Sequence, residues 1–169
     1  MQEKKRVERV VKVGGSLLDL PDLAKRLQPW RPALFVVGGG AMADAVRSLH
    51  RIHRLPEEVS HWLALRTCTL HAHFLAHLLG LPVVSRPEQG PGVLDAVAFC
   101  EADEANPEHL PHSWEATSDS LAARVAEVAR AELILLKSTD GPFEALVDSV
   151  CPQIVHRTGL RVQIVNLRA

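Results

Sequence analysis

Two clusters of glycine, each directly after a short apolar run, constrain this chain most. Residues 10–16 read VVKVGGS, and residues 34–40 read LFVVGGG. Each pattern predicts a buried strand that ends in bare backbone and then opens a helix. Glycines at the carboxyl end of a strand let a phosphate or a small acid approach main-chain N–H groups closely. Lys12 adds a cation beside the first cluster, so the sequence predicts a site for phosphate chemistry.

Composition narrows the class of protein. A chain of 169 residues and 18.5 kDa is long enough for one domain with its own core, and we expect a single domain over 1–169. A net charge of −1, 4% aromatic residues and no tyrosine argue against a nucleic-acid-binding surface. No apolar stretch approaches the roughly 20 residues of a membrane span, and the N-terminal segment does not resemble a signal peptide. Cys68, Cys100 and Cys151 form no metal or disulfide pattern, which indicates a reducing, cytoplasmic location.

Hydrophobic periodicity predicts alternating strands and helices. The predicted strands cover 7–13, 34–37, 82–85, 93–99, 133–136 and 162–165. The predicted helices cover 17–30, 41–52, 56–79 and 117–130, and a polar exposed loop is expected over 101–111. This alternation is typical of an α/β protein, and we expect a three-layer αβα sandwich with a mostly parallel central sheet.

Four segments in this order resemble the amino acid kinase superfamily, which includes acetylglutamate, uridylate, aspartate and isopentenyl phosphate kinases. The segments are 11–16 (VKVGGS), 37–40 (VGGG), 117–123 (TSDSLAA) and 133–141 (LILLKSTDG). The resemblance implies a compact amino acid kinase fold, with an acceptor side over about 1–112 and a shortened nucleotide side over about 113–169. It also implies an ATP-dependent phosphotransferase that acts on a small phosphate-bearing or anionic acceptor.

A narrower resemblance concerns one branch of this superfamily. Trp114 followed by 117–120, together with His61 and Trp62 near the start of the long helix, is most similar to the branch that phosphorylates aminomethylfuran-methanol phosphate. That branch belongs to methanofuran biosynthesis, so this acceptor is the specific hypothesis for the chain.

The resemblance also assigns roles to residues. Lys12 is expected to reach the transferring phosphoryl group, and Asp119 to accept hydrogen bonds from that lysine and orient it. The implied nucleotide-binding residues are Gly14, Gly15, Ser16, Lys137, Asp140 and Gly141. The implied substrate-binding residues are Gly38, Gly39, Gly40, Arg47, Trp114 and Ser118. Mg²⁺ would arrive with ATP, and no dedicated metal site is expected in the protein.

Each assignment has a structural alternative. Asp119 has the position of an ordinary charge in the first turn of a helix. Arg47 and Lys137 can each be solvated, and Trp114 can serve as an anchor for a loop. The glycines at 38–40 also suggest a dinucleotide fingerprint, but the GxGxxG spacing and an acidic residue at the end of the next strand are missing.

The histidines permit further interpretations. His73 and His77 have the i, i+4 spacing of a zinc motif, but no glutamate follows the first of them. We therefore interpret them, with His71, as surface or interface residues. His50 and His53 lie in a basic segment that is either solvated or attractive to an anionic substrate.

The region after Gly141 departs from the superfamily pattern. Only residues 142–169 follow it, and the turn at Asp140 is compressed. This leaves two alternatives open: a catalytically inactive protein that binds a ligand or a partner, and a kinase for isopentenyl phosphate, a nucleotide or an amino acid. The helix over 56–79 offers a candidate dimer face, so a homo-oligomer is expected.

Overall fold

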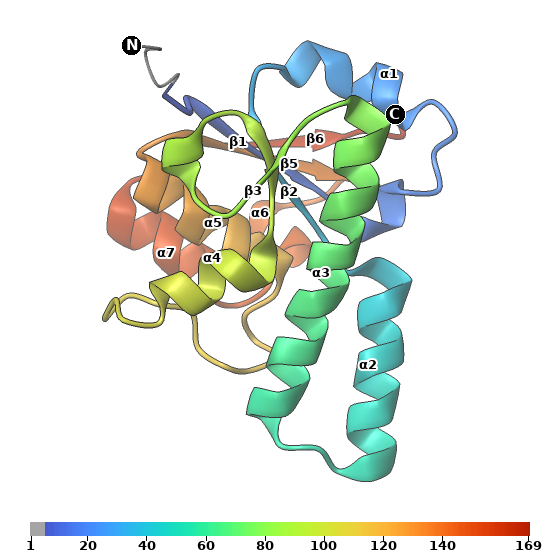
Figure 1. Cartoon of the computed structure of the whole chain (residues 1–169), viewed down its shortest axis with the longest axis vertical. Coiled ribbons are helices and arrows are strands. Elements are labelled where there is room, and N and C mark those ends of the chain that lie inside the picture. The colour runs from blue at the N-terminus through green and yellow to red at the C-terminus, as the bar shows by residue number, and fades with distance from the viewer. Residues whose placement is uncertain (1–5) are drawn as a thin grey trace.

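The sheet is parallel and lies between two layers of helices, as the computed structural model of residues 6–169 shows (Figure 1). Its order is β3-β4-β2-β1-β5-β6. The strands are β1 (Arg9–Val13), β2 (Leu34–Val37), β3 (Val83–Val84), β4 (Gly92–Leu94), β5 (Glu132–Lys137) and β6 (Val162–Asn166). Every neighbouring pair is parallel, so the carboxyl ends of all six strands meet at one edge. The predicted three-layer αβα sandwich is confirmed.

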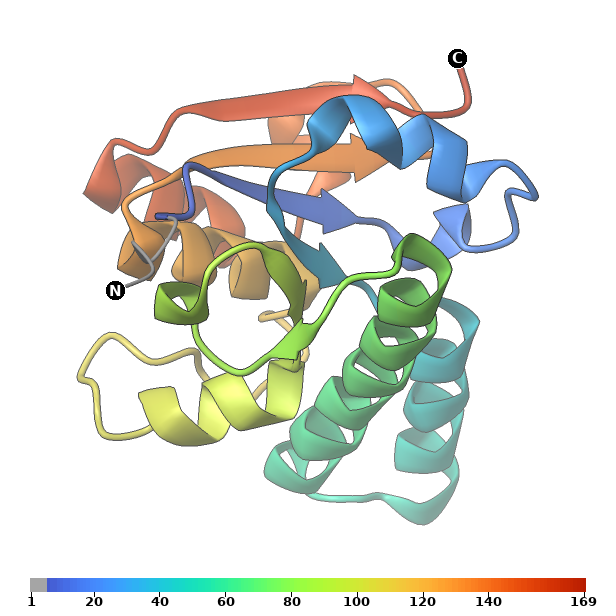
Figure 2. The same ribbon diagram turned by 45° about the horizontal axis from the view of Figure 1, so that its top comes forward.

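Seven α-helices flank this sheet in the described residues. They are α1 (Leu23–Leu27), α2 (Gly40–His53), α3 (Glu57–Leu79), α4 (Ala96–Asp103), α5 (Ser118–Ala129), α6 (Phe143–Leu146) and α7 (Cys151–Thr158). Helices α2 and α3 lie side by side as a hairpin that projects away from the sheet (Figures 1 and 2). The first turn after β1 is a short 3₁₀-helix, η1 (Gly15–Leu17). None of the helices between residues 6 and 169 combines the length and apolar character of a membrane-spanning segment.

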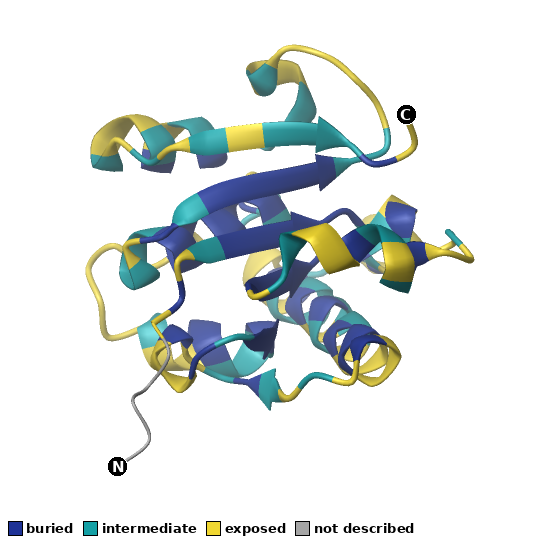
Figure 3. Ribbon diagram, turned by 90° about the horizontal axis from the view of Figure 1, so that it is seen from above, coloured by how far each residue is buried: buried dark blue, intermediate teal, exposed yellow. Residues whose placement is uncertain are grey.

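The core explains why the central strands are apolar on both faces. Val10, Leu34 and Leu133 face one cluster of buried side chains that includes α4, α5 and α7. Val11 and Phe35 face a second cluster that includes α1 and the C-terminal half of α3. Figure 3 shows this burial in β1, β2 and β5, while the edge strand β6 is partly exposed. Strands covered on both faces read as continuous apolar runs, which is the pattern that the sequence shows.

Two predicted elements are wrong. The predicted helix over 17–30 is broken into η1, the short α1 and a 3₁₀-turn, because prolines at 21 and 29 each remove a backbone donor. The predicted strand over 93–99 ends at Leu94, since Asp95 caps α4 by accepting a hydrogen bond from the backbone N–H of Ala98. Helix α4 therefore also takes the first residues of the predicted loop over 101–111. Helices α6 and α7 had no counterpart in the sequence analysis.

Candidate functional site

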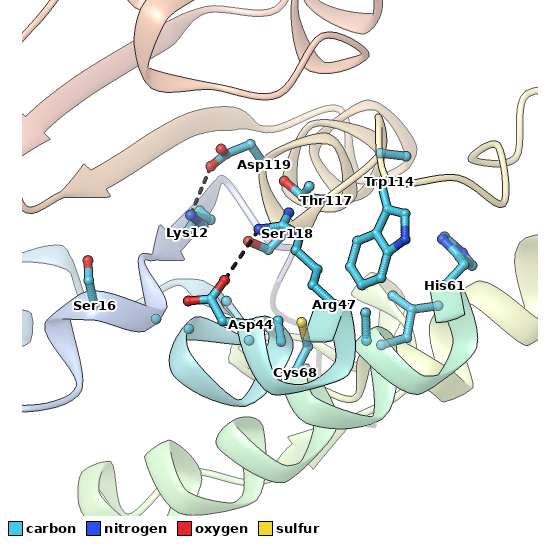
Figure 4. Close-up of a pocket in the computed structure, with 18 of the residues that line it drawn as sticks. Lys12, Ser16, Asp44, Arg47, His61, Cys68, Trp114, Thr117, Ser118 and Asp119 are labelled. Atoms are coloured by element: carbon cyan, nitrogen blue, oxygen red, sulfur yellow. Dashed lines mark hydrogen bonds and ion pairs between the residues drawn. The ribbon is translucent and has the colours of Figure 1, made fainter. Parts of the chain in front are cut away.

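A pocket of about 300 Å³ opens at the carboxyl ends of β1 and β2 (Figure 4). Its lining comes from four segments: residues 12–16, residues 38–47 at the start of α2, residues 61–68 on α3, and residues 113–119 before and within α5. In a parallel α/β sheet, ligands bind at this edge, where loops and helix N-termini present main-chain N–H groups.

The two glycine loops touch each other and form the floor of this pocket. Gly38 donates its backbone N–H to the carbonyl of Val13 at 2.9 Å. A side chain at Gly15 would place its Cβ only 2.3 Å from the backbone nitrogen of Gly40. Gly40 has φ of +50°, which a residue with a side chain rarely adopts. The floor therefore consists of bare backbone, and an anion can approach it without meeting a side chain.

His71 contacts the main chain of this floor, a role that the sequence analysis missed. One ring nitrogen of His71 lies 2.7 Å from the carbonyl oxygen of Gly38. The interpretation of His71 as a surface or interface residue is therefore wrong, because it is half-buried against the glycine loop. His73 and His77, on the same helix, are exposed.

A buried cluster of three charges lies at one end of the pocket. The Nζ atom of Lys12 lies 2.9 Å from Asp119 Oδ1, and the Nζ atom of Lys137 lies 2.7 and 2.8 Å from the two oxygens of the same carboxylate. Only 5% of Lys12 and 6% of Asp119 are exposed. One carboxylate therefore holds two ammonium groups.

The charges of this cluster set its protonation. Burial by itself raises the pKa of Asp119, but Lys12 and Lys137 outweigh this effect and lower it below its usual value. Burial and the nearby Lys12 lower the pKa of Lys137, although Asp119 opposes them. Asp119 is thus held as a carboxylate, a group that accepts hydrogen bonds from Lys12 and does not act as a base at neutral pH.

Arg47 and Trp114 form the opposite wall. The guanidinium carbon of Arg47 lies 4.9 Å from the centre of the Trp114 ring, in a cation–π contact, and Arg47 Nη1 lies 3.3 Å from Asp44 Oδ1. Both Arg47 and Asp44 face the pocket in Figure 4. The buried indole N–H of Trp114 has no hydrogen-bond acceptor within the described residues.

His61 and Cys68 complete the inner part of the pocket. Burial, together with the neighbouring His112, lowers the pKa of His61 to about 4, so its ring is neutral at neutral pH. Burial raises the pKa of the Cys68 thiol to about 11, which keeps it protonated and unsuited to nucleophilic chemistry.

The chain and its fold are similar to those of known kinases. No family model matches the chain. The chain is 26% identical over 151 residues to the (5-(aminomethyl)furan-3-yl)methyl phosphate kinase of Methanocaldococcus jannaschii, covering 80% of this chain and 68% of that protein. The structure of the present chain resembles uridylate kinase from Archaeoglobus fulgidus, with a TM-score of 0.66 and 19% identity. The match covers 94% of this chain and 90% of the other. The structure also resembles UMP kinase from Ureaplasma parvum, with a TM-score of 0.68, 12% identity, and coverage of 98% and 91%.

The chain has the fold of these kinases and is similar in sequence to the curated phosphate kinase. The predicted fold is confirmed, the similarities agree with the predicted resemblance, and the prediction of a small-molecule kinase agrees with the name of the curated relative.

The structure gathers most of the predicted site residues in one place. The predicted residues that line the pocket are Lys12, Gly15, Ser16, Gly38, Gly39, Gly40, Arg47, Trp114, Ser118 and Asp119. The remaining four lie outside that lining, on the side of β5. Gly14 donates its N–H to Leu136, Lys137 contacts Asp119, Asp140 accepts a hydrogen bond from Asn166, and Gly141 lies beside Leu146.

Asp148 holds the start of α5, the turn that carries Asp119, although nothing in the sequence points to it. Its Oδ2 accepts hydrogen bonds from the backbone N–H groups of Thr117 and Ser120, at 3.1 and 3.0 Å. Its Oδ1 accepts from the N–H of Cys151, at 2.9 Å, in the first turn of α7. A single carboxylate therefore caps both α5 and α7. The capping residue lies 31 positions after Thr117, which local sequence rules do not reach.

Proposed function

We propose that this protein transfers a phosphoryl group from ATP, bound with Mg²⁺, to a small acceptor that itself carries a phosphate. The observation that carries the proposal is the buried Lys12–Asp119 pair at one end of a pocket whose floor is bare glycine backbone. An anion can reach both the floor and Lys12 from this pocket.

Phosphoryl transfer requires positioning and neutralisation of charge more than covalent chemistry. Lys12 is placed to stabilise charge on the group in transit, and Asp119 fixes the direction of its ammonium group. The glycine cradle suits a phosphate, because Gly15 and residues 38–40 line the pocket without side chains between a ligand and the main chain. Bound Mg²⁺ would neutralise part of the charge on the nucleotide phosphates.

We place the nucleotide near Gly14, Ser16 and the end of β5. Ser16 and Ser138 lie 3.1 Å apart there, so the loop after β1 and the loop after β5 are neighbours. Lys137, Asp140 and Gly141 belong to the same side of the molecule, and we propose that they contact the nucleotide or shape its subsite.

We place the acceptor between the glycine floor and α3. The guanidinium group of Arg47 is suited to grip the acceptor phosphate. Beyond it, Leu65, Cys68 and Trp114 line space for a small flat ring, while Asp44 and His61 add polar groups. This mixture supports an aromatic acceptor with an amine over a purely aliphatic one such as isopentenyl phosphate. The narrower proposal is therefore an aminomethylfuran phosphate, in agreement with the name of the curated relative.

Calorimetry with Mg-ATP, followed by turnover assays, tests the proposal. We expect the wild type to bind Mg-ATP and to release ADP fastest with an aminomethylfuran phosphate, compared with UMP and isopentenyl phosphate. Lys12→Ala should lose about 10²–10³-fold in rate, the usual cost of one charge-stabilising donor. Lys25→Ala, which changes an exposed lysine, is the matched control.

Two outcomes would contradict the proposal. Binding of Mg-ATP without turnover on any phosphate acceptor would indicate an inactive ligand-binding protein. Turnover that survives in Lys12→Ala would remove Lys12 from the chemistry.

We also propose a homodimer that works in the cytoplasm. Exposed apolar side chains lie on both helices of the α2–α3 hairpin: Leu49 and Ile52 on α2, and Leu70, Phe74 and Leu78 on α3. Such a surface is typical of an interface between subunits. The three cysteines are all buried and free, which suits a reducing compartment.

A further inference from the structure

The loop between α4 and α5 gathers three side chains that commonly bind metals. They are Glu104, His109 and His112, and one potential ligand atom from each lies within 4.8 Å of the other two. His112 Nε2 lies 2.8 Å from Glu104 Oε1, and His109 Nδ1 lies 3.8 Å from the same oxygen. In a tetrahedral centre with bonds of about 2.0–2.1 Å, ligand atoms are roughly 3.3 Å apart. The two distances lie on either side of that value.

A second observation concerns the other nitrogen of His112. Its Nδ1 atom lies 3.7 Å from Oε1 of Glu58, in the first turn of α3. Metal-bound histidines commonly donate their second ring N–H to a carboxylate, which fixes both the tautomer and the direction of the ring. At 3.7 Å Glu58 is beyond hydrogen-bond distance, and a small movement of its exposed side chain would make it such a partner.

Two aromatic rings also pack against the ring of His112. It stacks on His61 at 4.9 Å between ring centres and 24° between planes, and Trp62 contacts it edge-on at 5.4 Å. Within the described residues, the only ion-pair partners of Glu104 are His109 and His112, so no lysine or arginine neutralises this carboxylate. A divalent cation would do so.

We propose that Glu104, His109 and His112 bind a divalent transition metal ion of the Zn²⁺ class, with water in the remaining position and Glu58 as the hydrogen-bond partner of His112. Two imidazoles and one carboxylate suit Zn²⁺, whereas Mg²⁺ prefers oxygen ligands. His109 Nδ1 now lies 2.9 Å from the carbonyl oxygen of Leu110, and metal binding exchanges that contact for a bond to the ion.

The ion would stabilise one wall of the pocket. Ser113 and Trp114 follow His112 directly in the chain, and both line the pocket. His61, on which His112 stacks, lines it as well. Metal bound here would tie the end of α4 to the segment that leads into α5. Binding of the metal itself does not depend on the proposed kinase activity.

The test uses metal-free protein and no nucleotide, because ATP chelates metal ions. We expect one equivalent of Zn²⁺ to bind in calorimetry, and Co²⁺ to give the visible absorption of a tetrahedral site. Excess Mg²⁺ should not compete. His112→Ala and His109→Ala should each abolish the Co²⁺ spectrum, and Glu58→Gln should weaken binding by roughly 10–100-fold.

The control is the double variant His73→Ala/His77→Ala, which removes the exposed histidine pair on α3. It should bind like the wild type. Circular dichroism of every variant checks that it is folded. The proposal is overturned if the wild type binds no Zn²⁺, or if binding survives in His112→Ala and His109→Ala but disappears in the control.

Discussion

At the scale of single residues, Asp119 is the centre of the candidate site. It neutralises Lys12 from β1 and Lys137 from β5, two strands that pair in parallel. A buried charge is tolerated when it is paired, and removal of its partner is costly. The two lysines therefore depend on one carboxylate, and the three residues behave as a unit.

Asp119→Asn should destabilise the fold by about 3–5 kcal/mol, because it leaves two ammonium groups together without a counter-charge. The free energy of unfolding in urea at neutral pH measures this effect. Asp22→Asn, at an exposed helical ion pair with Arg26, is the matched control and should leave stability nearly unchanged. Equal stability of the two variants would show that Lys12 and Lys137 do not depend on the carboxylate of Asp119.

Lys12→Met should separate stability from chemistry. Lys137 still pairs with Asp119 in this variant, so the free energy of unfolding should fall much less than in Asp119→Asn. Turnover should fall by about 10²–10³-fold under the proposed function. Urea unfolding and ADP release, measured on the same preparation, give the two values, and a large loss of both would contradict the separation.

Acid should reveal the lowered pKa of Asp119. A carboxyl group with a lower pKa in the folded state contributes stability that is complete above its unfolded value of 3.8 and is lost as the pH falls through the folded value. The free energy of unfolding should therefore fall as the pH drops below about 4. In the same series of urea titrations, the free energy of unfolding of Asp119→Asn should depend less steeply on pH. The same slope as in the wild type would argue against a lowered pKa of Asp119.

At the scale of elements, Asp148 joins the start of α5 to the start of α7. The catalytic proposal depends on the first turn of α5, which carries Asp119. A loop residue thus fixes the position of a helix that carries the charge cluster.

Asp148→Ala should destabilise the fold by about 1–4 kcal/mol, since it removes two helix caps at about 0.5–2 kcal/mol each. It should also lower turnover, because the start of α5 is released. Asp95→Ala removes the cap of α4, a helix that carries none of the three charges, and should affect stability alone. Unchanged turnover in Asp148→Ala would show that α5 is held by packing.

The sequence predicted those parts of the molecule that local rules govern. The apolar strands around β1, the glycine loops and the helices over 41–52, 56–79 and 117–130 follow from periodicity and turn residues. The contact between Lys12 and Asp119 came from a family resemblance, since spacing alone does not join residues so far apart. Asp148, His71 and the sharing of Asp119 with Lys137 depend on tertiary packing, so no local pattern could indicate them.

At the scale of the whole molecule, the α2–α3 hairpin both closes the pocket and exposes an apolar surface. Arg47 and His61 of this hairpin line the pocket, and Leu70, Phe74 and Leu78 on α3 are exposed. If that exposed surface joins two subunits, the acceptor wall is also braced by the partner.

Phe74→Glu should convert the dimer to a monomer, because it places a charge within the exposed apolar surface. Light scattering after size-exclusion chromatography at micromolar concentration gives the mass. His73→Glu, at the neighbouring exposed position, is the control and should stay dimeric. A wild type that runs as a monomer would refute the interface.

The contact between the two glycine loops has a consequence for how such an enzyme changes its acceptor during evolution. Gly15 and Gly40 leave no room for each other's side chains, and a Cβ at Gly39 would lie 2.4 Å from Thr67 Oγ1. Mutation cannot reshape this floor without dismantling it. The neighbouring walls, built by Arg47, His61 and Trp114, have side chains that can be exchanged. Homologues with new acceptors should therefore keep the floor and differ in the walls, and libraries made to redirect the enzyme should be confined to those wall positions.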